Sequence, residues 1–175
     1  GMRTGIHLKG VQRDSVPDWV VERYKPVVLD VPPLQENQPW RIQTVPPWQP
    51  EVDKAFHEFM RAFAATGIAQ DPGVVYGYIH GISASRGEEM FIRPIDWQKW
   101  EETTGITAEK FADWLRRRVD AMCEAFQGVE YKLAVTWGGP LGPTAGLRTA
   151  TADLHEYAFN KGAGIRGGGI DFMHG

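Results

Sequence analysis

The sequence contains a single cysteine, Cys123, in 175 residues. One cysteine excludes an intrachain disulfide and any metal site built from several thiolates. An excess of charge of one sign is also absent, because 19 Lys and Arg residues against 22 Asp and Glu residues give a net charge of −3. A charge this small predicts neither a nucleic-acid partner nor a membrane-surface partner. No apolar stretch is long enough to span a bilayer.

Several catalytic and binding motifs are missing as well. The five histidines show neither HxH nor HExxH spacing, so we predict no metal and no cofactor. Ser83 and Ser85 lack the Gly-x-Ser-x-Gly frame of a serine nucleophile. The glycine-rich run Gly164–Gly169 lacks the Lys-Ser/Thr of a phosphate-binding loop. A nucleotide-binding α/β domain therefore remains only a third possible function class.

Tryptophan, in contrast, is abundant. The chain is 42% hydrophobic and 23% charged, which is ordinary for a globular protein, but it has seven Trp and five Tyr residues. Four of the seven tryptophans, Trp40, Trp48, Trp97 and Trp100, fall between the predicted strands and helices. Indole rings on loops suit a sugar-binding cleft, where the C–H faces of a pyranose stack on them, or they pack as core.

Strands and helices are predicted to alternate along the chain. A proline- and tryptophan-rich stretch, Lys25–Pro50, interrupts them, and its prolines disfavour a central strand or a helix over most of its length. The predicted strands are Thr4–Gly10, Gly73–His80, Tyr131–Trp137 and Gly164–Phe172. The predicted helices are a short piece at Pro17–Tyr24, then Pro50 to Thr66, Thr107 to Gly128, and about Thr151 to Asn160.

This alternation predicts a single α/β domain over residues 1–175 with parallel strands. Long loops after strands and short loops after helices are typical of a TIM barrel. About four βα units in 175 residues are half of the usual eight, so we predict a parallel (β/α) barrel that is an incomplete TIM barrel, a fragment of a larger one. The alternatives are a small open sheet that is complete as it stands and a doubly wound sheet.

The stretch GISASRGEEMFIRP follows the predicted buried strand Gly73–His80. It sets Arg86, Glu88 and Glu89 at the carboxyl end of that strand, where barrel enzymes carry their catalytic groups. A retaining glycosidase needs two carboxyl groups about 5–5.5 Å apart, one an acid/base and the other a nucleophile. Adjacent glutamates point in different directions, so this stretch supplies one member of such a pair.

The order of short motifs resembles the (β/α)8 glycoside hydrolases of the β-galactosidase-like kind (clan A). The matching pieces are Pro17-Asp18-Trp19, the run PPWQPEVDKAFHEFMRAF, Asp71-Pro72, Gly87-Glu88-Glu89 and GIRGGGIDF. The resemblance implies a retaining glycosidase whose acid/base is Glu89, with Glu88 open as the alternative. The family's commoner Asn-Glu dipeptide is absent. The family's nucleophile lies on a seventh strand that this chain does not reach, so the isolated chain is expected to be inactive.

Further residues are candidates for substrate contacts. Each has a second interpretation: the tryptophans as packing, Arg86 as an ion-pair partner of Glu88, the histidine as a core residue, and the aspartate as a solvated terminus. The predicted substrate-binding residues are Trp48, Trp137, Arg86, His80, Trp97 and Asp171.

The sequence thus predicts a carbohydrate-active protein of glycoside hydrolase type. The alternative is a non-catalytic carbohydrate-binding or structural protein. The expected partners are a carbohydrate substrate and a further copy of the chain that completes the barrel, with no nucleic acid and no membrane.

Overall fold

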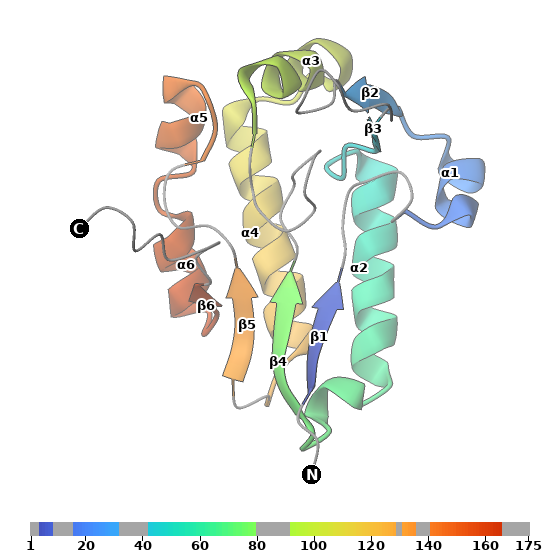
Figure 1. Cartoon of the computed structure of the whole chain (residues 1–175), viewed down its shortest axis with the longest axis vertical. Coiled ribbons are helices and arrows are strands. Elements are labelled where there is room, and N and C mark those ends of the chain that lie inside the picture. The colour runs from blue at the N-terminus through green and yellow to red at the C-terminus, as the bar shows by residue number, and fades with distance from the viewer. Residues whose placement is uncertain are drawn as a thin grey trace.

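The computed structural model describes residues 4–8, 16–31, 42–79, 92–128, 131–135 and 141–165 (Figure 1). The helices are α1 (Asp18–Tyr24), α2 (Pro50–Ala65), α3 (Pro94–Thr104), α4 (Ala108–Ala125), α5 (Ala145–Ala150) and α6 (Leu154–Asn160), with a 3-10 turn η2 (Ile68–Gln70). The strands are β1 (Thr4–Leu8), β2 (Leu29–Val31), β3 (Ile42–Thr44), β4 (Val74–Ile79), β5 (Tyr131–Val135) and β6 (Gly164–Ile165).

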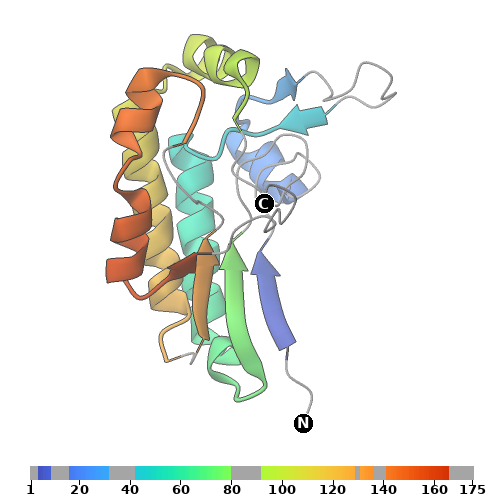
Figure 2. The same cartoon turned by 60° about the vertical axis from the view of Figure 1, so that its left-hand side comes forward.

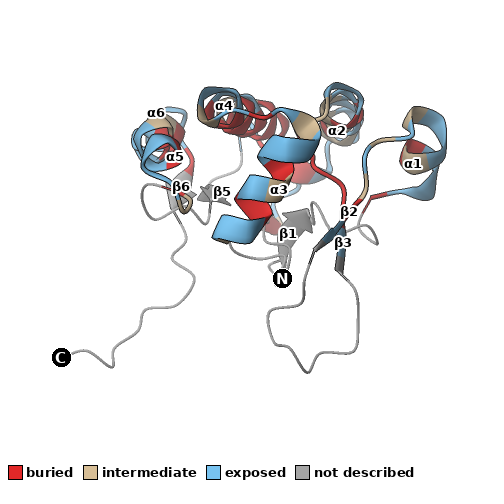
Figure 3. Ribbon diagram, turned by 90° about the horizontal axis from the view of Figure 1, so that it is seen from above, coloured by how far each residue is buried: buried red, intermediate tan, exposed pale blue. Residues whose placement is uncertain are grey.

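Four of the strands form a parallel sheet in the order β1-β4-β5-β6. The strand order follows the chain order because each connection returns through helices on the same face. Figure 3, which looks along the strands, shows α2, α4 and α6 side by side in one layer over one face of the sheet, and Figure 2 shows the same layer from the side. The described part of the chain is mostly helical.

The predicted (β/α) barrel, incomplete or otherwise, is wrong: no barrel is evident in the described residues. Among them, β1 pairs only with β4 and β6 pairs only with β5, so the sheet is open at both sides. Alternation of strands and helices sets the direction and order of strands, but closure also needs enough strands to bring the last one back to the first. Four strands do not meet that condition.

The proline-rich stretch before α2 was predicted to hold no central strand, and it contains a small second sheet. Strands β2 and β3 are three residues each and pair antiparallel, with Leu29 opposite Thr44 and Asp30 opposite Gln43. The Gln43 amide Nε2 donates to Asp30 Oδ1 at 3.1 Å. Proline is disfavoured within strands that have a neighbour on both sides. Among the described residues β2 and β3 pair only with each other, and both are short enough to lie between the prolines.

Helices α2 and α4 confirm the predictions for their regions. Pro50 occupies the first turn of α2, and Gly67 follows the helix with a φ of 70°. The Thr107 side chain accepts a hydrogen bond from the Lys110 backbone N–H at the start of α4. All five apolar residues of the predicted α4 stripe are fully buried: Phe111, Trp114, Leu115, Met122 and Phe126.

Two helices depart from the sequence prediction. The helix expected at about Thr151 to Asn160 begins only at Leu154, and a helix that was not predicted, α5, precedes it. Helix α3 lies in a region for which the sequence analysis predicted no helix.

The main core lies between the sheet, α2 and α4. At its lower end Phe126 packs against the backbone of β4 at Gly77, where a Cβ atom would lie 2.4 Å from the ring. A smaller core under α1 contains Val16, Val20, Val45, Val52 and Ala55. Together the two cores hold the helices on the sheet.

Candidate functional site

The last described residues of the four parallel strands pair with one another in one row. Leu8 is the partner of Ile79, Ile79 of Val135, and Val135 of Ile165. Each of these is the last residue of its strand. We call this row, Leu8-Ile79-Val135-Ile165, the carboxyl edge of the sheet. In open α/β sheets ligands bind outside the carboxyl ends of the strands, so this edge is the candidate functional site.

Six predicted site residues follow the carboxyl edge in the sequence. They belong to the segments after β4, β5 and β6, and all six lie outside the described residues. The register brings together the points at which these three segments leave the sheet. The residues are His80, Arg86, Glu88 and Glu89 after β4, Trp137 after β5, and Asp171 after β6.

Trp48 and Trp97, predicted to stack on sugar rings, are core residues in the structure. Trp97 is 2% exposed and Trp48 is 8% exposed. Trp48 packs edge-on against Trp100, with ring centroids 4.8 Å apart, and its Nε1 donates to Thr104 Oγ1 at 3.0 Å. Neither ring offers a face to a sugar. Stacking on a sugar is excluded for both rings because side chains of α3 and α4 pack against them.

Helix α3 lies across the carboxyl edge (Figure 1). Its buried residues are Asp96, Trp97 and Trp100, which form the face that packs into the protein. On its outer side the Lys99 ammonium donates to the backbone carbonyl of Asp30 on β2, which ties α3 to the small sheet. The helix therefore forms a roof above the carboxyl edge of the sheet (Figure 1).

A buried ion pair marks the start of this roof. The Arg93 guanidinium makes a two-pronged contact with Asp96, from Nε to Oδ2 at 2.6 Å and from Nη2 to Oδ1 at 2.7 Å. The Asp96 side chain is 2% exposed and the Arg93 side chain is 14% exposed. Asp96 Oδ2 also accepts the Arg93 backbone N–H at 3.4 Å, as in a capping box. Sequence reasoning missed this pair, although Arg-Pro-x-Asp ahead of Trp97 carries its signal.

A second charged group joins α2 to α4. The Asp53 carboxylate lies 3.5 Å from His57 Nε2 and 3.2 Å from Arg117 Nη2. Burial alone would raise the pKa of Asp53, but His57 and Arg117 outweigh it and hold that pKa below its ordinary value. The neighbouring Arg118 is buried with its guanidinium 3.9 Å from the Phe56 ring centroid, and burial lowers its pKa to about 10.

Between α2 and α4 there is also a small hollow of about 80 Å³. Ligand pockets measure about 300–1,000 Å³, so the hollow is too small for a sugar. Its lining consists of His57, Met60, Arg61, Ala64, Ala121, Glu124 and Ala125. Within the described ranges no three His, Cys, Asp or Glu side chains gather to hold a metal ion. Nor is any helix there long and apolar enough to cross a membrane.

No family model, no curated protein and no solved structure matches the chain. The resemblance to β-galactosidase-like hydrolases therefore stays a prediction, and the candidate site depends on the register of the sheet.

Proposed function

We propose that the chain binds carbohydrate at the carboxyl edge of its parallel sheet and acts there as a glycoside hydrolase. Glu89, or alternatively Glu88, is the acid/base of this proposal. The observation that supports it is the single row Leu8-Ile79-Val135-Ile165, because the segments that carry the two glutamates, Trp137 and Asp171 follow three of the strands whose last described residues form this row. The proposal does not require a closed barrel.

The proposed chemistry starts with a protonated glutamic acid that donates its proton to the glycosidic oxygen. The resulting carboxylate then removes a proton from an attacking water. Such an acid needs a pKa raised towards neutral, which burial or a neighbouring carboxylate provides. Trp137 supplies a ring face for the sugar, since Trp48 and Trp97 are buried. The resemblance places the nucleophile on a further strand.

Binding is the first test. Calorimetric titration of the chain with gluco-, galacto- and manno-oligosaccharides should give saturable binding to at least one of them. Trp137→Ala should weaken that binding by about tenfold or more, since stacking on an aromatic ring contributes about 1–3 kcal/mol. Trp19→Ala is the matched control, because Trp19 is 50% exposed on α1 and should leave the affinity unchanged. Absence of saturable binding to the whole panel would rule out the proposal.

Hydrolysis is the second test. In a protein that also carries the nucleophile strand implied by the resemblance, with aryl glycosides as substrates, Glu89→Gln should lower kcat by about 100-fold or more and leave the dissociation constant almost unchanged, because amides bind but do not transfer the proton. Glu88→Gln tests the alternative assignment. Glu101→Gln, an exposed residue on α3, is the control. Binding without hydrolysis in the unmutated protein that includes the nucleophile strand would favour the alternative, a non-catalytic carbohydrate-binding protein.

A further inference from the structure

We propose that Arg118 is an anion-binding residue beside the carboxyl edge of the sheet, and that it selects an acidic sugar through a carboxylate or phosphoryl group. The sugar in this inference rests on the proposed function, but the anion site itself is built from described residues only.

The guanidinium of Arg118, on α4, is buried without a hydrogen-bond acceptor. Arg118 is 4% exposed. Among the described residues its guanidinium makes no hydrogen bond and no ion pair, and it contacts ring faces instead: its Cζ lies 3.9 Å from the Phe56 centroid and 5.2 Å from the Trp114 centroid. An arginine side chain carries five N–H donors. Because buried donors in proteins are nearly always paired, this side chain is suited to a ligand that supplies acceptors.

The positive charge of Arg118 is also not matched by a carboxylate in contact with it among the described residues. Asp53 is the acidic group whose charge stabilises it, but the Asp53 oxygens lie against His57 and Arg117. Burial lowers the pKa of Arg118 to about 10, so the guanidinium remains charged at neutral pH. Desolvation of a buried ion generally costs more free energy than a cation–π contact returns. A ligand with a negative charge would offset that cost, and a neutral sugar would not.

A second buried donor lies beside this guanidinium. Nε1 of Trp114 has no hydrogen-bond partner in the described part of the chain, and the Trp114 ring is the one whose centroid lies 5.2 Å from Arg118. The indole N–H of a buried tryptophan usually finds an acceptor. A carboxylate or phosphoryl group has more than one acceptor oxygen, so one such group can accept from both side chains.

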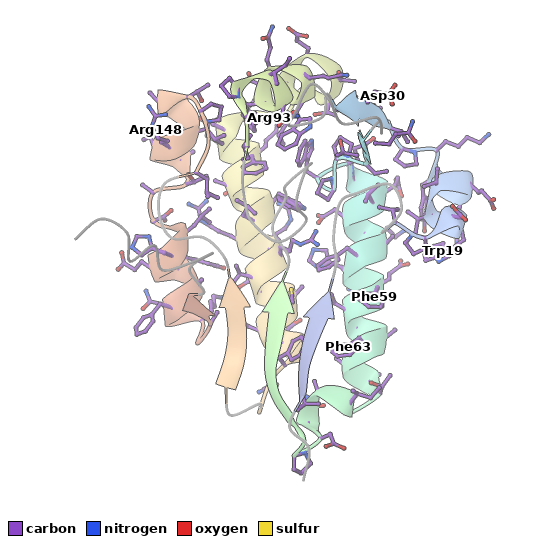
Figure 4. The ribbon with its side chains drawn as sticks, viewed as in Figure 1. Trp19, Asp30, Phe59, Phe63, Arg93 and Arg148 are labelled. Atoms are coloured by element: carbon purple, nitrogen blue, oxygen red, sulfur yellow. The ribbon has the colours of Figure 1, made fainter. Side chains whose placement is uncertain are left out.

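The guanidinium lies at the level where the strands end. Phe63 packs on Phe126, with ring centroids 5.4 Å apart, and Phe126 packs on β4 at Gly77, so these rings mark the level of Gly77. Helix α2 runs opposite to the strands, and Figure 4 shows Phe63 on the half of this helix that lies beside them. Phe56 is two turns earlier on the same face of α2, about 10 Å nearer the roof, whereas Ile79 ends β4 only about 7 Å beyond Gly77. The guanidinium that stacks on Phe56 therefore lies just beyond the carboxyl edge, on its roof side.

This position joins the anion site to the proposed carbohydrate site. Ligands of open α/β sheets bind outside the carboxyl ends of the strands. A sugar bound there lies on the same side of the sheet as the Arg118 guanidinium, a group that contacts carboxylates and phosphoryl groups in a two-pronged manner. An acidic sugar, either a uronic acid or a sugar phosphate, is therefore the substrate class that this residue favours over a neutral one.

The test is titration calorimetry of the full chain with anions of both kinds: glucuronate, galacturonate, glucose-6-phosphate and inorganic phosphate. Sodium chloride keeps the ionic strength constant, so that screening does not differ between them. At least one anion should bind saturably, and Arg118→Met should weaken its binding by about tenfold or more, because hydrogen bonds to a charged group contribute that much. The control is Arg61→Met, which removes the same charge from an exposed position on α2 and should leave the affinity unchanged.

Failure of every anion to bind, or equal affinity in Arg118→Met and the unmutated chain, would overturn the proposal. Where Arg118→Met does not fold, the same comparison is made with Arg118→Lys, which keeps the charge but loses the two-pronged contact. A purely structural role of Arg118 would lower thermal stability in these variants and leave the anion affinity unchanged. Inorganic phosphate contains no sugar, so its binding tests the site independently of the proposed function. Binding of neutral oligosaccharides alone would support the proposed function and overturn this inference.

Discussion

At the scale of single residues, Gly77 shows how closely the helices approach the sheet. A Cβ atom at this position would lie 2.4 Å from Cε1 of Phe126, which is fully buried. We expect Gly77→Ala to lower the free energy of unfolding by about 1–3 kcal/mol, because the ring must move in a packed core. Urea denaturation followed by circular dichroism measures the change.

The matched control for this prediction is Gly146→Ala. Gly146 lies in α5, and a Cβ atom there would meet no heavy atom within 4 Å. Alanine at this helical position should raise stability by about 0.5–1 kcal/mol. If Gly77→Ala were as harmless as Gly146→Ala, the close packing of Phe126 on β4 would be refuted.

The tryptophans show that the burial of a single residue could not be predicted from its position in the sequence. Trp48 and Trp97 looked like candidates for a cleft because they lie between predicted strands and helices, yet both are buried. The partner that fixes the Trp48 indole, Thr104, is 56 residues away in the sequence. Contacts over such separations do not appear as a local pattern. Trp19, in contrast, lies within a predicted helix and is half exposed.

At the scale of helices and strands, the sequence predicted a helix correctly where residues typical of helix ends stood at both its start and its end. The predictions for α2 and α4 had a proline or threonine at the start, a glycine just beyond the end and a periodic apolar stripe between them. Helix α3 also has Pro94 at its start and Gly105 after its end, with a φ of 65°, but its apolar residues are few. The β2–β3 pair has no such signal, because its strands are only three residues each.

The contact between α2 and α4 makes stability depend on pH. The folded protein holds the pKa of Asp53 below the ordinary 3.8. A carboxyl group with a lowered folded-state pKa stabilises the fold fully above its unfolded value, and this contribution is lost as pH falls through the folded value. Below about pH 4 the ion pairs of Asp53 should therefore weaken, and the buried Arg118 should lose the favourable charge of Asp53.

We expect Asp53→Asn to cost about 1–3 kcal/mol at pH 7, in the range of hydrogen bonds to charged groups. The same substitution should reduce the loss of stability between pH 5 and 3 (~2 pH units) relative to the unmutated chain. Thermal denaturation at a series of pH values measures both effects. Asp113→Asn is the control, since Asp113 pairs with Arg116 but its side chain is 64% exposed. Identical pH profiles for Asp53→Asn and the unmutated chain would contradict the assignment.

At the scale of the whole molecule, alternation predicted the parallel direction of the strands, and the structure adds the order β1-β4-β5-β6. The barrel inferred from the same alternation was wrong. It was inferable that the segments with predicted site residues follow the same edge of the sheet, because carboxyl ends of parallel strands share an edge. Which tryptophans reach that edge was not inferable, since their burial depends on α3, a helix that the sequence analysis missed.

The open sheet predicts a pattern of backbone hydrogen exchange. Strand β4 has a neighbour on each side, so its amides should all exchange slowly. Among the described strands β1 pairs with β4 alone, so only the β1 amides directed towards β4 should be protected, in alternation along the strand. Exchange measured by NMR, residue by residue from Thr4 to Leu8, resolves this alternation.

Uniform protection along β1 would contradict the open sheet at this side, because it requires a strand on the other side of β1. Repeating the measurement over a range of protein concentrations would then identify that strand. Protection that falls on dilution would mean that a second copy of the chain pairs with β1, since association follows mass action. Protection that is independent of concentration would mean that another segment of the same chain covers β1.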